Sequence, residues 1–505
     1  MLAPQRGRIA TDKVKTNNCE PRIRTRALSA KRSTLPELSN FACLPGRAGG
    51  TPISLIILLW VRAAPLRRSE SQVTEVACPA ASPRPFTTGC IWAFAICIAV
   101  LPLMQWTLWE RFGSVATIAD AVFAASFVLF AAALLRRELA WRCGNGFYLA
   151  LGFYAGALLL STLAAADRAA SAGTLVVEAY LLSIALLAFN FVRSERTLKL
   201  VTQAWMLGTV FTVVAGIAGV LLFYCNVRGE ANIFLSTYGT LLPGNYPRIR
   251  GLFLNMNMCC NYLSVSLLLL LAMRCVGWIG RRAARILGAG IVVAALFTFS
   301  PGLGGLALGA GLWFWAEYRG RGRAVAARSA LLAGVAIALA FAGAMLVSPP
   351  SLFGPEGRLD LSHGQPSGRV LCWRDALHMA WEYKWLGKGP GSAVASVDYL
   401  TASGEQQLLT DAHNTFLSMA AQKGVLGLAA FCFLLIVVLR KPHLQTTGRP
   451  EVVLHTAAWI ALVQAMVYQG LGGSWEHTRH LWVLIGLTAA LQVGEASNWE
   501  QKVSS

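Results

Sequence analysis

Long apolar stretches alternate with short polar or basic segments along most of this chain. About twelve of these stretches approach the roughly 20 residues that a helix needs to cross a bilayer. They centre on residues 89–108, 117–135, 147–165, 174–192, 199–224, 257–274, 286–300, 302–317, 327–348, 415–439, 452–470 and 480–494. The pattern therefore predicts an all-α polytopic membrane protein with about twelve transmembrane helices.

The composition indicates a bilayer as the solvent, because 55% of the 505 residues are hydrophobic and only 13% are charged. The net charge of +20 does not indicate nucleic-acid binding, because most basic residues fall in alternate short loops. Cytoplasmic loops carry such residues, so we predict that both termini are cytoplasmic. The basic clusters lie at residues 136–142, 193–199, 274–285, 319–328 and 440–441.

Three regions differ in composition. Residues 1–85 are basic and show no periodicity, which predicts a disordered N-terminal extension. Within it, the apolar run at 53–60 is too short to span a membrane, and we interpret it as an interfacial segment. Residues 86–495 hold all the predicted spans, and residues 496–505 are predicted to form a short cytoplasmic tail.

The 12 cysteines form no C-x-x-C pair and do not cluster with histidine, and many lie within the apolar stretches. This distribution is typical of small packing residues rather than of disulfides or metal ligands. We predict neither a metal site nor a cofactor.

Two segments on the non-cytoplasmic side, 225–256 and 349–414, are much longer than a connection requires. The second lies between the ninth and tenth predicted spans. Both carry cations that the charge rule does not expect there: Arg228, Arg248, Arg250, Arg358, Arg369, Arg374, Lys384 and Lys388. An anionic ligand would explain these cations. The alternative is that long loops cross regardless of charge and that the cations face solvent or lipid headgroups.

The first long segment ends "YPRIRGLFLNMNM", in which Arg248 and Arg250 precede a predicted helix. Asn255 or Asn257 can cap that helix, which leaves its free N–H groups and positive dipole end close to Arg250.

The second long segment contains "SGRVLCWRDALHMAWEYKW". Its large apolar residues recur at helical spacing and predict an amphipathic helix at the membrane interface. These residues are Val370, Trp373, Leu377 and Trp381. With Ser367 as the N-cap, Arg369 falls in the first turn, where the dipole and a guanidinium together favour phosphate. Arg374 lies off the apolar stripe.

A histidine and an asparagine stand directly before the tenth span, in "DAHNTFLSMAAQKGVLGLAAF". Asn414 is a candidate N-cap. His413 is either a solvated loop histidine or, because a helix N-terminus favours neutral imidazole, a proton acceptor. Gly424 and Gly427 within the span predict close helix packing.

Arg250, Arg369 and His413 are thus predicted at one membrane face, each near a helix N-terminus. Two arginines can neutralise a pyrophosphate leaving group, and a neutral histidine can deprotonate an acceptor hydroxyl. No Asp-rich motif stands beside them to indicate a metal. The pattern favours a phosphate-bearing substrate that is attacked by a hydroxyl.

Three blocks of this sequence resemble the O-antigen ligase and polymerase superfamily: "RIRGLFLNMNMCCNYL", "GRVLCWRDALHMAWEYKWLGKGPGS" and "HNTFLSMAAQKGVLGLAAF". The likeness covers roughly residues 90–495 and implies a helical membrane protein of about twelve spans. At 255–257 the chain has Asn-Met-Asn where the family commonly shows Asn-Pro-Asn. At 300–303 it has Ser-Pro-Gly-Leu where the family commonly shows Ser-Arg-Gly-Gly.

The resemblance implies a metal-independent glycosyltransferase of the C-type fold in the bacterial inner membrane, with a large periplasmic loop between helices 9 and 10. It implies transfer of a glycan from undecaprenyl pyrophosphate to a hydroxyl of the lipid A core at the periplasmic face. His413 would then stand on the acceptor side, and Arg250 and Arg369 toward the pyrophosphate. The other candidate substrate-binding residues are Asn414, Arg374, Asn257 and Arg248. The implied partners are the lipid-linked donor, the lipid A core or another glycan acceptor, and membrane lipid, with no nucleic acid.

Other functions either use the same donor with a different acceptor or involve no glycan transfer. An O-antigen or exopolysaccharide polymerase and a protein O-oligosaccharyltransferase differ from a ligase only in the acceptor. A transporter or flippase predicts internal repeats and mid-bilayer charges, but the halves show no repeat. Asp120 and Glu178 are predicted in the outer parts of their spans, lining a cavity or pairing with arginine. A structural scaffold would need neither His413 nor Arg369. Three further residues are expected to contact the acceptor or, as we favour, to be solvated at the interface: His477, Arg479 and His480.

Overall fold

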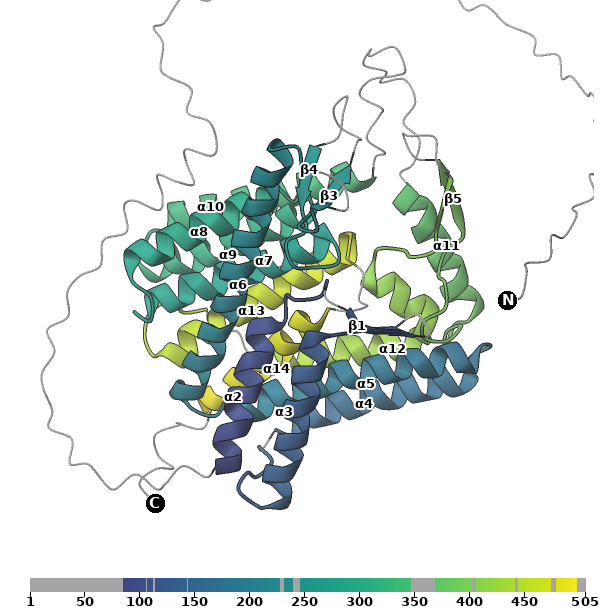
Figure 1. Ribbon diagram of the computed structural model, residues 1–505, viewed down its shortest axis with the longest axis horizontal. Coiled ribbons are helices and arrows are strands. Elements are labelled where there is room, and N and C mark those ends of the chain that lie inside the picture. The colour runs from purple at the N-terminus through teal and green to yellow at the C-terminus, as the bar shows by residue number, and fades with distance from the viewer. Residues whose placement is uncertain are drawn as a thin grey trace, which may run out of the picture. The chain divides into compact units, whose positions relative to one another are not determined.

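The computed structural model describes residues 85–496, apart from 106, 112–113, 143, 228–230, 239–245, 347–367, 401–405, 441–443 and 474–477 (Figure 1). The predicted disordered extension and cytoplasmic tail lie outside these residues. So do four residues named above, Arg228, Arg358, Ser367 and His477.

The described part of the chain contains thirteen helices, twelve of which coincide with the predicted stretches. They are α2 Pro85–Val100, α3 Ile118–Leu135, α4 Asn145–Ala164, α5 Arg168–Phe191, α6 Glu195–Tyr224, α7 Met256–Cys275, α8 Arg281–Leu296, α9 Gly302–Gly320, α10 Ala324–Leu346, α12 Thr415–Leu439, α13 Pro450–Leu471 and α14 Arg479–Ala496. The thirteenth, α11 Gly368–Glu382, is the helix predicted within the second long segment.

Three small antiparallel hairpins lie in the connections, so the fold is mostly helical rather than purely so. Strand β1 Thr107–Arg111 pairs with β2 Ser114–Thr117, β3 Leu235–Tyr238 with β4 Tyr246–Ile249, and β5 Val397–Leu400 with β6 Gln406–Leu409. The first predicted span was wrong at its end. Helix α2 stops at Val100, because Pro102 cannot continue a helix, and β1 follows.

Eight of the described helices are long and apolar enough to cross a membrane: α3, α4, α5, α6, α7, α10, α12 and α13. Two more, α2 and α14, are apolar but shorter. Helix α8 has only 16 residues. This set of apolar helices is that of a multi-pass membrane protein.

Helices α7 and α13 form the centre of the bundle. Their apolar windows are 89% and 78% buried, whereas that of α10 is only 11% buried. Helix α10 instead packs against α9 at the side (Figure 1). Polar contacts also link the inner helices: Trp205 on α6 stacks on Tyr262 of α7 with 5.3 Å between ring centroids, and its Nε1 donates to Ser266 at 2.9 Å. Such interhelical hydrogen bonds stabilise helix packing within a bilayer.

Backbone hydrogen bonds join several connections at one end of the bundle. We call this the loop end; among the described residues it comprises 101–105, 107–111, 114–117, 225–227, 231–238, 246–255, 297–301, 383–400, 406–414, 472–473 and 478. Met104 N donates to Leu252 O at 3.0 Å, and Ile249 N donates to Phe297 O at 2.9 Å. At the same end, the Thr415 hydroxyl oxygen lies 3.3 Å from Gly473 O. The loop end therefore gives the candidate residues a fixed backbone.

Candidate functional site

His413 stands in a tight turn directly before α12. Asn414 caps the helix, because its Oδ1 accepts from the N–H groups of Phe416 and Leu417, which confirms the predicted cap. His413 itself has a φ of 47°, a left-handed conformation that is uncommon for a residue with a side chain. The turn is held by Asp411, whose Oδ1 accepts from His413 N at 3.2 Å.

Asp411 also contacts the His413 ring. Its Oδ2 lies 3.2 Å from His413 Nδ1, and the two side chains are 35% and 42% exposed. A carboxylate on Nδ1 favours the tautomer that carries its proton there and leaves the Nε2 lone pair available. The imidazole is therefore oriented and still reachable from solvent.

Helix α11 packs beside this turn. Its small residue Ala376 is buried with Val394, Ala412 and Ala421, and Trp373 packs against this cluster. Trp373 Nε1 donates to Ala412 O at 2.8 Å, so the first turns of α11 are tied to the residue before His413.

Cys372 is a buried thiol on α11, and charged residues on α11 and in the turn before α12 affect its pKa. Burial, followed by the carboxylates of Asp375 and Asp411, raises the pKa of this thiol to about 11, and the charge of Arg369 opposes the rise. Arg369 lies in the first turn of α11, the helix that Trp373 ties to Ala412, next to His413. The structure therefore places the two predicted residues on adjacent elements.

The predicted apolar stripe of α11 divides between two sides. Trp373 packs toward α12, whereas Leu377 and Trp381 are 56% and 72% exposed. The buried side is instead made by Cys372 and Ala376, because small residues allow α11 to approach α12 closely. Arg374 is exposed on the same helix.

A second group of residues comes from the bundle itself. Arg248 fixes its guanidinium on the end of α8, where Nε and Nη2 donate to the carbonyls of Thr298 and Phe299, each at 2.9 Å. Ser300 donates to Asn257 Oδ1 at 2.8 Å. Asn255, one of the two predicted caps, is the residue that caps α7.

Tyr468 lies on α13 near this second group. Its hydroxyl donates to Gly472 O at 3.3 Å, and its side chain lines a pocket with Pro301, the residue after Ser300. Arg250 lies elsewhere on the loop end: its Nε donates to Ile233 O at 2.8 Å, and burial lowers the pKa of the guanidinium. Among the described residues, that hydrogen bond ties Arg250 to segment 231–235 rather than to α11 or α12.

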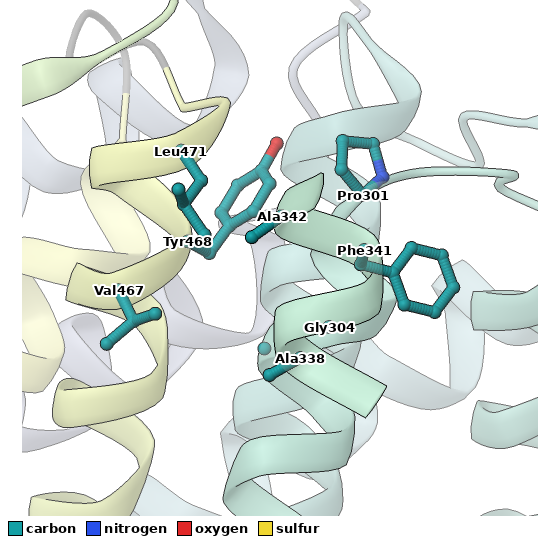
Figure 2. A pocket seen from close by; sticks show the side chains of 9 residues that line it. Pro301, Gly304, Ala338, Phe341, Ala342, Val467, Tyr468 and Leu471 are labelled. Carbon is teal, nitrogen blue, oxygen red and sulfur yellow. The ribbon is translucent and has the colours of Figure 1, made fainter. Parts of the chain in front are cut away.

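An apolar pocket lies beside Tyr468, between α9, α10 and α13. It is lined by Pro301, Gly304, Gly305, Ala338, Phe341, Ala342, Val467, Tyr468 and Leu471. Figure 2 shows the Tyr468 ring lying across this pocket toward Pro301, with Val467 and Leu471 on the α13 side. Val467 is 39% exposed, so the pocket borders the outer surface of the bundle.

Two predictions about the last outer turn were wrong. Arg479 is only 5% exposed and forms an ion pair with Asp120, with its Nε 2.8 Å from Oδ1 and its Nη2 2.7 Å from Oδ2. His480 is 2% exposed and packs edge-on against Tyr262. Neither is solvated, because α14 begins inside the bundle. The expected pairing of Asp120 with an arginine is confirmed.

Glu178 pairs with a lysine instead of the predicted arginine. Lys423 Nζ lies 2.5 Å from Glu178 Oε1, and both side chains are buried. Its position follows from Gly427, which leaves the space that the stem of Lys423 occupies. The glycine therefore accommodates a side chain of its own helix rather than a neighbouring helix.

Helix α12 is interrupted at Gly424, where φ is 67° and ψ is −173°. The chain that follows α11 fills the gap: Val425 N and Leu426 N donate to the carbonyls of Lys384 and Trp385 at 2.8 and 3.2 Å. A Cβ at Gly424 would overlap the Trp385 carbonyl. The predicted close packing is therefore real, but the partner is a loop.

The same loop also satisfies the carbonyl groups on the other side of the break. Lys388 N and Gly389 N donate to Ala421 O and Gln422 O at 3.0 and 2.9 Å. Non-helical backbone within a membrane protein is tolerated where protein groups satisfy it in this way.

Sequence reasoning missed Asp411, Lys423 and Tyr468. A carboxylate two residues before His413 was a usable signal for the first, since a short turn brings such side chains together. A lysine inside an apolar span was a usable signal for the second, because such residues need a partner. Nothing in the sequence around Tyr468 distinguishes it from other tyrosines near the end of a span.

These elements define a multi-pass helical membrane protein with arginines, a histidine and a carboxylate gathered at one end. The family model described as O-Antigen ligase matches residues 286–432, which include α11, Arg369 and His413, and it confirms the resemblance to the O-antigen ligase superfamily. At this coarse level, the match indicates glycan transfer of the ligase or polymerase type, with a lipid-linked glycan donor and a glycan acceptor. No curated protein and no solved structure matches the chain.

Proposed function

We propose that this protein transfers a glycan from undecaprenyl pyrophosphate to a sugar hydroxyl of the lipid A core at the periplasmic face of the inner membrane. The observation that carries the proposal is the Asp411–His413 pair next to α11, whose first turn carries Arg369, within the segment that matches the O-antigen ligase model. The loop end of the bundle would then be periplasmic, and both termini cytoplasmic.

In the proposed reaction, His413 Nε2 takes the proton of the acceptor hydroxyl as its oxygen attacks the anomeric carbon of the donor sugar. A new glycosidic bond forms while the bond from that carbon to the pyrophosphate oxygen breaks. Asp411, 3.2 Å from Nδ1, stabilises the imidazolium that results. The undecaprenyl pyrophosphate leaves with the electron pair of the broken bond.

Arg369 is the proposed main ligand of the leaving pyrophosphate. It lies in the first turn of α11, the helix that is tied to the turn of His413, so it can bind the donor next to the base. Arg248 contributes positive charge from the bundle side while its own carbonyl contacts fix it. Cations aimed at developing negative charge are typically a large part of such catalysis.

Four candidate residues have secondary roles in the proposal. Arg250 lies on a separate segment and would contact the glycan or the distal phosphate. Asn414 and Asn257 hold the helix starts at the site, and exposed Arg374 would contact the acceptor. The apolar pocket beside Tyr468 would contact the isoprenoid chain, because its lining is mostly apolar and it borders the outer surface of the bundle.

The test is the fate of lipid-linked glycan with purified protein in lipid vesicles and lipid A core as the acceptor. We expect intact protein to consume the donor and label the core, and His413→Ala to reduce the rate by about 100-fold to 10,000-fold, the usual contribution of a general base. His378→Ala is the matched control, because His378 is an exposed histidine of α11 outside the proposed site.

The competing functions give different products in the same assay. Growth of the donor into longer lipid-linked chains would replace the ligase with a polymerase, and labelling of added protein would replace it with an oligosaccharyltransferase. Movement of intact donor across the vesicle membrane, with no bond formed, would favour a flippase.

The orientation can be tested separately with a thiol reagent that does not cross membranes. Cys225 ends α6 at the loop end, Cys275 ends α7 at the other end, and both are exposed. In intact cells with a permeable outer membrane, we expect Cys225 to be labelled and Cys275 to be protected. The reverse pattern would overturn the proposed topology.

A further inference from the structure

Glu178, Lys423 and Tyr154 form a buried polar group that the proposed reaction does not use. The Tyr154 hydroxyl accepts from Lys423 Nζ at 2.9 Å and donates to Glu178 Oε2 at 3.1 Å, in addition to the ion pair. The lysine and glutamate side chains are only 3% and 7% exposed. Ionisable groups in apolar spans are costly, and where they occur they commonly serve function.

The group stands at the break in α12. Residues 415–423, which we call the site segment, run from the cap at Asn414 to Lys423, and the non-helical Gly424 follows. Lys423 is therefore the last residue of the site segment, while its partners belong to α4 and α5. One end of the site segment presents His413, and the other end is tied to two helices of the bundle.

Hydrogen bonds hold the site segment and α11 together, and we treat the two as one body. Trp373 is bonded to Ala412 at the start of the segment, and the chain after α11 is bonded to Ala421 and Gln422 near its end. This body carries Arg369 and His413. The bundle carries Arg248, held on the end of α8, and Tyr468 on α13. The candidate site is thus divided between two bodies, which the chain of α12 connects at the break.

A glycine with a positive φ permits backbone conformations closed to other residues, so the break does not by itself set the direction of the site segment. The loop after α11, which is bonded to residues on both sides of the break, and the contacts at the two ends of the segment set it together. At the start, the Thr415 hydroxyl donates to Gln469 Oε1 at 2.9 Å on α13. At the end, Lys423 reaches Glu178 and Tyr154, and Ser161 donates to Gln422 O at 3.1 Å.

We infer that Lys423, Glu178 and Tyr154 are positioning residues, which fix the site segment about its break at Gly424 and so set His413 and Arg369 against Tyr468 and Arg248. The inference deepens the proposed function and rests on it wherever glycan transfer is the measurement. The three side chains act through the orientation of α12 and do not touch the reacting atoms.

The first experiment measures kcat and KM of glycan transfer for Lys423→Met, Glu178→Gln, Tyr154→Phe and the exchanged pair E178K/K423E. We expect kcat to fall about 100-fold in Lys423→Met, the usual effect of displacing reacting groups by about 1 Å. The donor KM should change less than about threefold, because ground-state binding tolerates displacement better than the transition state. The exchanged pair should recover most of the lost kcat.

The control is Asp120→Asn, which breaks the other buried ion pair, on α3 and α14, without touching α11 or α12. It should leave kcat within about threefold of the intact protein while lowering stability. An equal loss of kcat in Asp120→Asn would overturn the inference, because the effect would then come from lost stability alone. Failure of the exchanged pair to recover kcat would also count against it.

The second experiment does not depend on activity. Spin labels at Leu377→Cys on α11 and Leu296→Cys at the end of α8, both exposed positions, report the distance between the two bodies, with the other labelled cysteines replaced by serine. We expect Lys423→Met to broaden or shift this distance and Asp120→Asn to leave it unchanged. An unchanged distance in Lys423→Met overturns the inference. If intact protein transfers no glycan, the proposed function fails while these distances still decide the positioning role.

Discussion

Two buried ion pairs in this bundle use the same chemistry in different places. Lys423 pairs with Glu178, to which Tyr154 donates a hydrogen bond. Arg479 pairs with Asp120, to which Tyr180 donates a hydrogen bond. In each, a late helix supplies the cation, an earlier helix supplies the carboxylate, and a tyrosine donates to that carboxylate. Helix α5 contributes to both groups, since it carries Glu178 and Tyr180 two residues apart.

The difference lies in the backbone around the cation. Arg479 is the first residue of α14, and Asp120 also accepts from Thr117 N at 2.7 Å as part of the capping box of α3. That pair therefore fastens two helix starts. Lys423 instead stands within α12, next to Gly424, and its pair fastens a helix that is already interrupted. A buried ion pair thus fixes the start of a helix in one case and the orientation of a helix segment in the other.

The largest effect should come from removing either cation, since an unpaired buried charge costs ~3–5 kcal/mol. Lys423→Met should destabilise more than Arg479→Met, because Asp120 keeps its bonds to Thr117 and Tyr180 whereas Glu178 keeps only that of Tyr154 among those described here. Thermal unfolding in detergent measures both. Equal losses would mean that the remaining hydrogen bonds of Asp120 contribute little.

Gly424→Ala is expected to cost ~1–3 kcal/mol, because its backbone conformation is essentially confined to glycine. The clash of the new Cβ with the Trp385 carbonyl adds to this cost. Gly156→Ala on α4 is the matched control: a Cβ there meets no atom within 4 Å, so the change should be neutral or stabilising. Unfolding curves that coincide for Gly424→Ala and the intact protein would contradict the interrupted helix.

Tyr154→Phe and Tyr180→Phe each remove hydrogen bonds to one pair and should cost ~1 kcal/mol per lost bond. Tyr154→Phe should also slow glycan transfer severalfold, whereas Tyr180→Phe should not, because only Tyr154 contacts the site segment. Parallel assays of stability and transfer on the two variants separate these expectations. Slower transfer in both would erase the functional distinction between the pairs.

The smallest effect concerns Cys372, whose pKa of about 11 leaves it almost wholly protonated at neutral pH. Because the thiolate is the reactive form, alkylation should accelerate about 100-fold from pH 7 to pH 9, with no plateau below about pH 11. Lys423→Met should increase the rate at fixed pH by loosening α11, and Arg479→Met should not. Mass spectrometry of the alkylated peptide measures the rate, and a plateau near pH 8 would contradict the buried thiol.

The helices could be read from the sequence because apolar length is a strong signal, and the described helices coincide with the predicted stretches. Local capping was equally readable at Asn414 and Asn255, where one side chain satisfies adjacent N–H groups. Helix α11 was predicted, but its buried side was not, since Trp373 and Leu377 look alike in a periodic pattern and only the partner helix separates them.

The candidate site was only partly predictable. Arg369 and His413 were proposed because each stands near a predicted helix start, and the structure places them on two adjacent elements, α11 and the turn before α12. Arg250 was found by the same rule, but it lies on another segment of the loop end, which a rule about single helices cannot reveal. Arg479 was wrongly interpreted as interfacial. Its partner is Asp120, 359 residues earlier, and the sequence alone does not show that these two residues pair.

The Lys423–Glu178 contact also has a consequence for biogenesis, because its partners are 245 residues apart. Helix α5 enters the membrane long before α12 is synthesised. Until then, the Glu178 carboxylate lies among lipids or earlier helices without Lys423. Helix α12 in turn cannot settle until the loop after α11 has supplied the backbone groups that fill its break. The docking of α12 onto α4 and α5 should therefore be a late step in assembly.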